Sequence, residues 1–220
     1  MGERWATFDC YGTLVDWNAG IRGELARLFG EERADGLLAR YHDLEPRVQA
    51  EDPSRSYRQV LAAALELLAE SEGLRVPDGE ADALARSLPG WPVFPEVRGA
   101  LEEAGRRSWR LSILSNSDRD LIEASIERIG VRFELAVVAS EIGSYKPAHG
   151  HWHTFEREIG RLPDVHVAAS LFHDILPACE LGLRSVWINR LGEKAGAARP
   201  TRELPDLSAL PDVLDQLVPA

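Results

Sequence analysis

The sequence predicts an α/β protein in which a Rossmann-like parallel sheet forms the core and an all-helical cap domain is inserted into it. Two observations lead to this class. Short apolar runs alternate with helical patterns over most of the chain, which is typical of βα units and an open parallel sheet. Between Asp16 and Trp91 the alternation stops and only helical patterns remain. We therefore expect a core built from residues 1–15 and 93–220, and a cap built from residues 16–92.

The predicted strands are short, nearly continuous apolar runs. Such runs are expected of parallel strands that helices cover on both faces, because neither face then meets water. The five runs are residues 5–9, 110–115, 134–139, 166–170 and 185–189. The stretch 192–206 is expected to be an ordinary loop.

Helical patterns fill the intervals between these strands and the whole of the insertion. In the core, one apolar face carries Leu121, Ile122, Ser125, Ile126 and Ile129, another carries Trp152, Phe155 and Ile159, and a shorter helix is expected near 175–181. In the insertion, the faces are formed by Ile21, Leu25, Leu28 and Phe29, and by Val60, Leu61, Leu65 and Leu68. A helical segment inserted beside a sheet edge often covers a site.

Composition excludes several classes of protein. Apolar residues make up 45% of the chain and charged residues 28%, as in a globular protein. The net charge of −11 argues against nucleic acid as a partner, because phosphate binding requires a basic face. No apolar stretch is long enough for a membrane span, and the N-terminus is too polar for a signal peptide. Cys10 and Cys179 lie far apart and outside any CxxC pair, which favours reduced thiols and a cytoplasmic location.

Polar side chains stand where four of the predicted strands end. Asp9 and Thr13 follow the first strand, Ser115 and Asn116 the second, Lys146 the third, and Ser170 and Asp174 the fourth. Ligands of open parallel sheets bind at this edge. Each residue also has an ordinary explanation: Ser117 or Asp118 can cap the next helix, a Lys before Pro can be a solvated loop residue, and Asp174 can start a helix. Four such coincidences at one edge are much rarer than any single one.

This set of residues resembles the haloacid dehalogenase (HAD) superfamily over nearly the whole chain. Asp9 matches the nucleophile position, Ser115 the second motif and Lys146 the third, and AASLFHD occupies the place of the fourth, acidic motif. Phosphatases of the superfamily read DxDGT at the first motif, whereas this chain reads DCYGT, with Tyr11 in place of the second acid. At the fourth motif Ala169 replaces a leading acid. Both changes disfavour a Mg²⁺ site, which needs carboxylate ligands, and so disfavour phosphoryl transfer.

The stretches DxYGTL, LSN, SYKP and VWINR together resemble the L-2-haloacid dehalogenases, which use no metal or other cofactor. The resemblance implies that Asp9 displaces halide from an L-2-haloacid through an ester, which water hydrolyses to a D-2-hydroxy acid. An ammonium close to a nucleophilic carboxylate keeps its pKa low, and Lys146 is suited to this role. Thr13 and Ser115 would orient Asp9 and the substrate carboxylate, while Asp174 would position Lys146 or the hydrolytic water. The resemblance also implies a small carboxylate substrate and a homodimer.

The other expected substrate contacts follow the family less closely. Tyr11 and Ser170 fall within matching motifs, and Asn116 is expected to donate to the departing halide. Arg40 stands at about the right distance to be the cap arginine, and Trp152 where a substrate-side Tyr is expected. Leu171 falls where the dehalogenases have an Asn that holds water. His173 is then a substitute that can activate water, or alternatively a half-buried helix cap.

Further alternatives remain open from the sequence. His42 and Glu45 would share a helical face in the cap, either as a surface pair or as a substrate contact. The reaction could be the opening of a strained ring at the 2-position, as in azetidine-2-carboxylate. Less favoured are a Mg²⁺-dependent phosphatase acting on a small ester and a catalytically silent binding protein.

Overall fold

Six parallel strands form one sheet in the order β3-β2-β1-β4-β5-β6. This computed structural model describes residues 2–52 and 55–220. The strands are β1 (Arg4–Phe8), β2 (Trp109–Ser115), β3 (Leu135–Val138), β4 (Val165–Ala168), β5 (Arg184–Ile188) and β6 (Arg202–Leu204). The α/β class with a Rossmann-like parallel sheet is therefore confirmed.

One strand was not expected. β6 lies inside the stretch 192–206, which the sequence predicts to be a loop, and it pairs with β5 at the edge of the sheet. It has only three residues, and two of them are exposed polar side chains. A strand this short, with one neighbour and no buried face, leaves no apolar pattern in the sequence.

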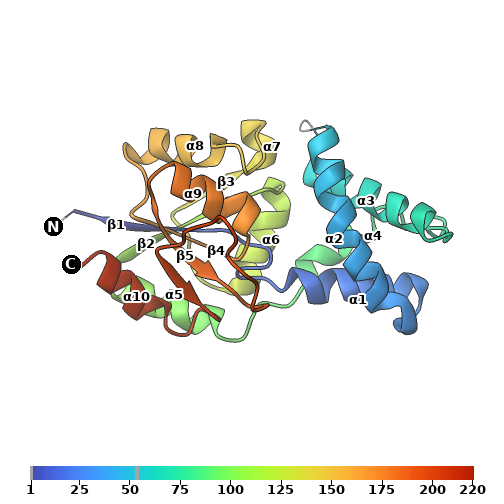
Figure 1. Ribbon diagram of the computed structural model, residues 1–220, viewed down its shortest axis with the longest axis horizontal. Coiled ribbons are helices and arrows are strands. Elements are labelled where there is room, and N and C mark those ends of the chain that lie inside the picture. The colour runs from blue at the N-terminus through green and yellow to red at the C-terminus, as the bar shows by residue number, and fades with distance from the viewer. Residues whose placement is uncertain (1, 53–54) are drawn as a thin grey trace.

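Helices cover both faces of the sheet (Figure 1). One face packs against α5 (Val97–Arg106), α6 (Arg119–Ile129) and α10 (Leu210–Leu217), which contribute to the largest apolar cluster. α8 (Gly150–Ile159) packs on the other face, on the same side as α9 (Leu176–Glu180). A short helix, α7 (Ala139–Ile142), follows β3. α9 lies where a helix is expected near 175–181. A π-helical turn over Leu171–Ile175 directly precedes it, so the helical segment begins at Leu171.

Among the described residues of the insertion, helices are the only regular elements. It contains α1 (Trp17–Phe29), α2 (Ala34–Glu51), α3 (Tyr57–Ser71), α4 (Ala83–Ser87) and two 3₁₀ turns, Glu31–Arg33 and Leu88–Gly90. Residues 53 and 54, within the predicted cap, lie outside the described residues. The helices stand beside the sheet in Figure 1. Gly20 of α1 is required by packing, because a Cβ there would lie 2.3 Å from the Trp91 ring.

The chain enters and leaves the insertion as a short antiparallel pair. The backbone N–H of Asp16 donates to the carbonyl of Pro92 at 2.7 Å, and that of Phe94 donates to the carbonyl of Leu14 at 3.1 Å. α3 begins with a capping box formed by Ser56 and the side chain of Gln59.

A core carboxylate also holds the start of α3. Asp118 precedes α6 but makes no side-chain bond to the N-terminus of that helix. Instead it accepts hydrogen bonds from the backbone N–H groups of Tyr57 and Arg58, at 2.9 and 3.0 Å. A carboxylate at a helix N-terminus satisfies free donors and complements the helix dipole. Asp118 therefore ties the insertion to the core.

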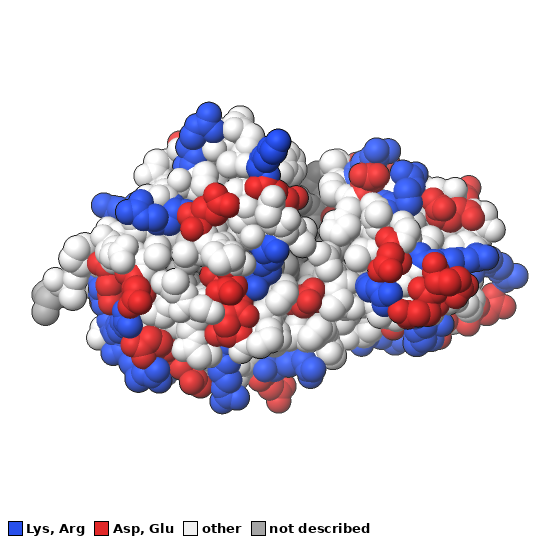
Figure 2. Space-filling model, turned by 60° about the horizontal axis from the view of Figure 1, so that its bottom comes forward, with Lys and Arg blue, Asp and Glu red and all other residues white. Residues whose placement is uncertain are grey.

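The strand order indicates where this sheet would bind a ligand. Acidic and basic side chains are interspersed over the face that Figure 2 shows, without an extended basic patch. No helix among the described residues is both long and apolar enough to cross a membrane. The strand order reverses direction at β1 and β4, and ligands of such sheets bind at the carboxyl ends of the strands at this switch point.

Candidate active site

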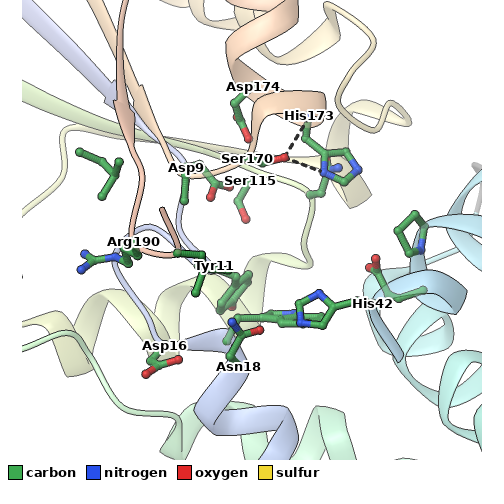
Figure 3. Close-up of a pocket in the computed structure, with 18 of the residues that line it drawn as sticks. Asp9, Tyr11, Asp16, Asn18, His42, Ser115, Ser170, His173, Asp174 and Arg190 are labelled. Atoms are coloured by element: carbon green, nitrogen blue, oxygen red, sulfur yellow. Dashed lines mark hydrogen bonds between the residues drawn. The ribbon is translucent and has the colours of Figure 1, made fainter. Parts of the chain in front are cut away.

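A pocket of about 710 Å³ opens where β1 and β4 end, between the sheet and the insertion. Figure 3 shows Asp9, Ser115 and Asp174 grouped on the core side, while Asn18 and His42 come from the insertion. We call the core side the floor, meaning Asp9, Lys146 and Asp174 with the residues that hold them. We call the side lined by α1, α2 and α3 the roof; its lining residues include Trp17, Asn18, Arg22, Leu38, His42, Glu45, Gln49 and Tyr57.

Lys146 lies at the centre of the floor and has no free N–H donor. Its Nζ is 2.9 Å from Oδ1 of Asp9, 2.6 Å from Oδ1 of Asp174 and 2.9 Å from the carbonyl oxygen of Leu114. All three charged side chains are buried. An ammonium has three N–H groups, and here each has an acceptor, so the geometry of Lys146 is fully determined.

The second oxygen of Asp9 is held as well. Oδ2 accepts a hydrogen bond from the hydroxyl of Thr13 at 2.8 Å, and that hydroxyl accepts one from the backbone N–H of Ala169 at 2.9 Å. The Asp9 carboxylate is therefore fixed in orientation at the end of β1, with its 8% exposed surface facing the pocket. Such a carboxylate is suited to attack a bound carbon atom.

The three charged groups influence one another strongly. Burial raises the pKa of Asp9, and the ammonium of Lys146 and the bond from Thr13 oppose that rise. Burial alone would also raise the pKa of Asp174, but Lys146 and the bond from His166 hold it below its usual range. The pKa of Lys146 is raised, because the two carboxylates outweigh its burial. The floor thus holds a permanent cation between two carboxylates.

A buried histidine, which the sequence analysis did not identify, forms a hydrogen bond with Asp174. The Nε2 of His166, in β4, lies 3.0 Å from Oδ1 of Asp174, and its Nδ1 lies 2.9 Å from the hydroxyl of Thr7 in β1. Oδ2 of Asp174 has no hydrogen-bond partner among the described residues although it is buried, and Asp174 lines the pocket. That oxygen is free to accept a hydrogen bond from a water molecule or a ligand.

Ser115 and Asn116 lie in the pocket lining, but only one of them has a free group. The hydroxyl of Ser115 is buried and has no partner among the described residues, so it can donate to a ligand. Asn116 accepts from the backbone N–H of Lys146 at 2.6 Å and donates to its carbonyl at 3.0 Å. The observed role of Asn116 is therefore to fix the segment that carries Lys146.

Tyr11 forms a wall of the pocket. Its ring stacks on Tyr57 with centroids 6.0 Å apart, and its hydroxyl lies 3.1 Å from the hydroxyl of Ser125 in α6. Because the Ser125 hydroxyl donates to the carbonyl of Leu121, Tyr11 is the donor in this pair. The phenol thus points away from Asp9, and the residue offers its ring to the pocket.

Ser170 and His173 form a local pair beside Asp174 (Figure 3). The hydroxyl of Ser170 accepts from the backbone N–H of His173 at 3.0 Å and lies 3.2 Å from its Nδ1. Burial lowers the pKa of His173, which favours a neutral imidazole. Both residues line the pocket, so the structure agrees both with a helix-start role and with contact to a ligand.

Two of the predicted substrate contacts do not reach the pocket lining. Arg40 is exposed on α2 and pairs with Asp43 and Glu72, because the face of α2 that meets the pocket carries Leu38, His42, Glu45 and Gln49 instead. Trp152 is fully buried between α8 and the sheet, with its ring 5.2 Å from that of His166. These two placements correct the sequence-based expectation: Arg40 belongs to the outer surface of the insertion and Trp152 to the core.

The pocket lining also contains two residues whose role the sequence left open, His42 and Glu45, and one that it did not indicate, Arg190. The ring of His42 packs against that of Trp17 with centroids 5.1 Å apart, and Glu45 is buried, so the two residues do not form a surface pair. Arg190, from the stretch after β5, lines the pocket and pairs with Glu96 at 2.7 Å. Their side chains meet the pocket through the packing of the insertion on the core, which local sequence patterns do not reveal.

The donor set does not fit a magnesium ion. Among the residues that the structure describes, no three His, Cys, Asp or Glu side chains are arranged to hold a metal. Asp9 and Asp174 both bind Lys146, and the residue beside Ser170 that would supply a further carboxylate is Ala169. An ammonium thus occupies the position between the two carboxylates, where its charge takes over part of the neutralisation that a cation would provide.

The fold and the floor of the pocket define the class of protein: the chain belongs to the haloacid dehalogenase-like hydrolases, whose family pattern it matches over residues 4–169. It is a hydrolase of this family. It is 29% identical over 222 residues to an (S)-2-haloacid dehalogenase of Pseudomonas sp. (strain YL), covering 94% of this chain and 93% of that protein. It is 28% identical to haloacetate dehalogenase H-2 of Moraxella sp. (strain B), covering 84% and 85%.

The same fold is found in a solved structure. The L-2-haloacid dehalogenase from Xanthobacter autotrophicus matches with a TM-score of 0.85 and 18% identity, covering 97% of this chain and 98% of that one. At this identity the likeness shows the fold alone.

Proposed function

We propose that this protein is a metal-independent hydrolase that uses Asp9 as a nucleophile and removes halide from small L-2-haloacids. The observation that carries the proposal is the fixed carboxylate of Asp9, held on one oxygen by Lys146 and on the other by Thr13. The similarity to an (S)-2-haloacid dehalogenase and to a haloacetate dehalogenase supports this substrate class.

In the first step, an oxygen of Asp9 forms a bond to C2 of the substrate. The bond between C2 and the halogen breaks, and the halide leaves with the bonding electron pair. The attack comes from the side opposite the leaving group, so the configuration at C2 inverts. We assign binding of the substrate carboxylate to the hydroxyl of Ser115, which has no partner among the described residues and belongs to the pocket lining. Burial raises the pKa of Asp9, and Lys146 opposes that rise and so favours the ionised, nucleophilic form.

In the second step, water attacks the side-chain carbonyl carbon of the Asp9 ester. One proton of the water passes to a base, the bond from that carbonyl carbon to the substrate oxygen breaks, and the base returns the proton to the departing hydroxy acid. The remaining carboxyl group of Asp9 ionises. The net reaction converts haloacid and water into D-2-hydroxy acid, halide and a proton, with the C2–O bond intact.

Two groups beside Asp9 are candidates for the base. Oδ2 of Asp174 has an open acceptor site but belongs to a carboxyl group of lowered pKa, which makes it a weak base. His173 has a neutral ring, and in the tautomer with its proton on Nδ1 toward Ser170 the Nε2 atom can accept a proton from water. We assign the base to His173 and the orientation of the water to Asp174.

The test is halide release from L-2-chloropropionate in the presence of EDTA, with Asp9→Ala as the control. Release that needs Asp9 and ignores EDTA supports the proposal. In a single turnover in ¹⁸O-labelled water, the label should enter Asp9 and not the hydroxy acid. Release that disappears with EDTA would contradict the metal-free mechanism, and absence of release would direct the assay to strained cyclic 2-amino acids and then to phosphate esters with Mg²⁺.

A further inference from the structure

Glu45 is a buried acid in the roof of the pocket with no partner in the protein. Its residue is 8% exposed and lines the pocket from α2. Among the described residues it makes no hydrogen bond and no ion pair. Burial alone accounts for the shift in its pKa, with no effect from a basic side chain. A carboxylate that is removed from water and left unpaired costs several kcal/mol, so natural proteins seldom keep one without a use.

Aromatic rings form the pocket wall on the same side. Trp17 and Tyr57 line the pocket and are joined by a hydrogen bond of 3.0 Å from the indole N–H to the phenol oxygen. Tyr11 stacks on Tyr57, and His42 stacks on Trp17. Aromatic faces attract organic cations, most strongly where water is excluded. The roof therefore combines an unpaired carboxylate with several rings.

The basic residues of the pocket cannot serve as the counterion of Glu45, because each is already paired. Lys146 binds Asp9 and Asp174, Arg190 binds Glu96, and Arg22 binds Glu31 and Asp35. The pocket thus has surplus negative charge at its roof. A purely anionic substrate would meet this charge as repulsion, whereas a ligand with a cationic end would neutralise it.

We propose that Glu45 and the aromatic wall of Trp17 and Tyr57 bind an ammonium group, so that the substrates are 2-substituted carboxylates with a positively charged far end. This inference rests on the proposed function, because it places the reacting carbon at Asp9 and the cationic end at the roof. The carboxylate of such a substrate meets Ser115 on the floor, and its ammonium meets Glu45. The two ends together select a zwitterion over a simple haloacid.

A competing role is that Glu45 stays protonated and donates a hydrogen bond to an uncharged part of the substrate. Burial raises its pKa to about 7, and the phenols of Tyr41, Tyr57 and Tyr145 lie near enough to interact with it. Burial lowers the pKa of His42, on the same helix, and so favours its neutral ring. Glu45→Gln separates the two roles, because Gln keeps a donor but cannot carry the negative charge.

The first experiment measures binding without turnover. Calorimetry at about pH 8 compares 6-aminohexanoate with heptanoate, in which a methyl group replaces the ammonium, and repeats the comparison for ligands one and two carbons shorter. We expect the ammonium ligand of at least one length to bind the wild type about tenfold or more tightly than its uncharged partner, as a charge-assisted hydrogen bond allows. Glu45→Gln should remove this preference. Glu193→Gln, which removes an exposed carboxylate from the pocket lining, should change it by less than about twofold.

The second experiment adds the chemistry. Chloride release is followed for (S)-6-amino-2-chlorohexanoate and (S)-2-chloroheptanoate, with an enzyme-free blank to subtract cyclisation of the amine. The ratio of their kcat/KM values should favour the amine in the wild type and fall about tenfold in Glu45→Gln. No preference for an ammonium at any length, or a preference that survives Glu45→Gln, would overturn the inference. Ammonium-selective binding without any chloride release would support the cation site and contradict dehalogenation instead.

Discussion

The floor and the roof of the pocket differ in how completely their charged groups are paired. On the floor, the three N–H groups of Lys146 all have acceptors, and both oxygens of Asp9 are held. On the roof, Glu45 has no partner among the described residues, and the ring of His42 packs against that of Trp17. The two sides therefore differ in role. The floor is preorganised without a ligand, as a reacting group requires, whereas the charged group of the roof gains its partner when a ligand binds.

The largest expected effect tests whether the floor alone carries the chemistry. Asp9→Asn should lower kcat by at least about 10⁴-fold, because the amide is not a nucleophile while its shape still fits between Thr13 and Lys146. Steady-state halide release measures the rate, and circular dichroism confirms the fold. A variant that kept the full rate with every substrate would show that another group attacks.

Removing the cation should affect both rate and stability. Lys146→Ala leaves Asp9 and Asp174 buried without a counterion, so we expect kcat to fall roughly 10²–10³-fold and the free energy of unfolding to fall by about 3–5 kcal/mol. Urea unfolding measures the stability. The double variant Lys146→Ala with Asp174→Asn should regain part of the stability and none of the activity. Recovery of both would mean that Lys146 acts only as a structural counterion.

Glu45 in the roof should make the free energy of unfolding depend on pH. The pKa of Glu45 is about 7 in the folded protein, against 4.5 for an ordinary Glu, so the folded state binds the proton more tightly. The contribution of Glu45 to the free energy of unfolding is therefore fully present below about pH 4.5. It is lost as the pH rises toward and through 7, by on the order of 3 kcal/mol. The free energy of unfolding of Glu45→Gln, measured beside the wild type from about pH 5 to pH 8, should lack this loss. Parallel pH profiles for the two proteins would place the titrating group elsewhere.

The smallest effect concerns the tie between the two regions. Asp118→Ala removes the carboxylate that accepts from Tyr57 and Arg58 at the start of α3, which should cost about 1 kcal/mol of unfolding free energy and raise KM more than it lowers kcat. Asp120→Ala is the matched control, because Asp120 pairs with the exposed side chain of Arg58 instead of the backbone at the start of α3. Its cost should stay below about 0.5 kcal/mol. Equal losses of unfolding free energy for the two variants would show that the hydrogen bonds from Asp118 to the start of α3 do not stabilise the protein.

The floor could be predicted from the sequence because the topology of a parallel sheet brings strand ends together. Asp9, Lys146 and Asp174 each follow a predicted strand, and no knowledge of side-chain packing was needed to place them at one edge. His166 could not be found in this way, because a single His inside an apolar strand gives no sign of the carboxylate it will meet.

The roof was less predictable because it depends on how separate helices rotate and pack. The periodicity of α2 shows that His42 and Glu45 share a face, but it does not show whether that face meets water or the core. The same uncertainty explains Arg40, which lies on the outer face of α2. Trp152 is a comparable case in the core, since an aromatic residue early in a helix fits a pocket wall and a buried interface equally well.

Residues 14–16 and 92–94 are hydrogen-bonded to each other where the chain enters and leaves the insertion, and this pairing affects how the insertion can evolve. They bring the two ends of the insertion together, and the entropy of closing a loop grows only with the logarithm of its length, by about 0.6 kcal/mol for each doubling. Deletions or additions within the helical segment therefore change the loop-closure entropy of the sheet little. The roof residues of this segment lie in one continuous stretch of sequence, separate from Asp9, Lys146 and Asp174, so the two sides of the pocket can change independently.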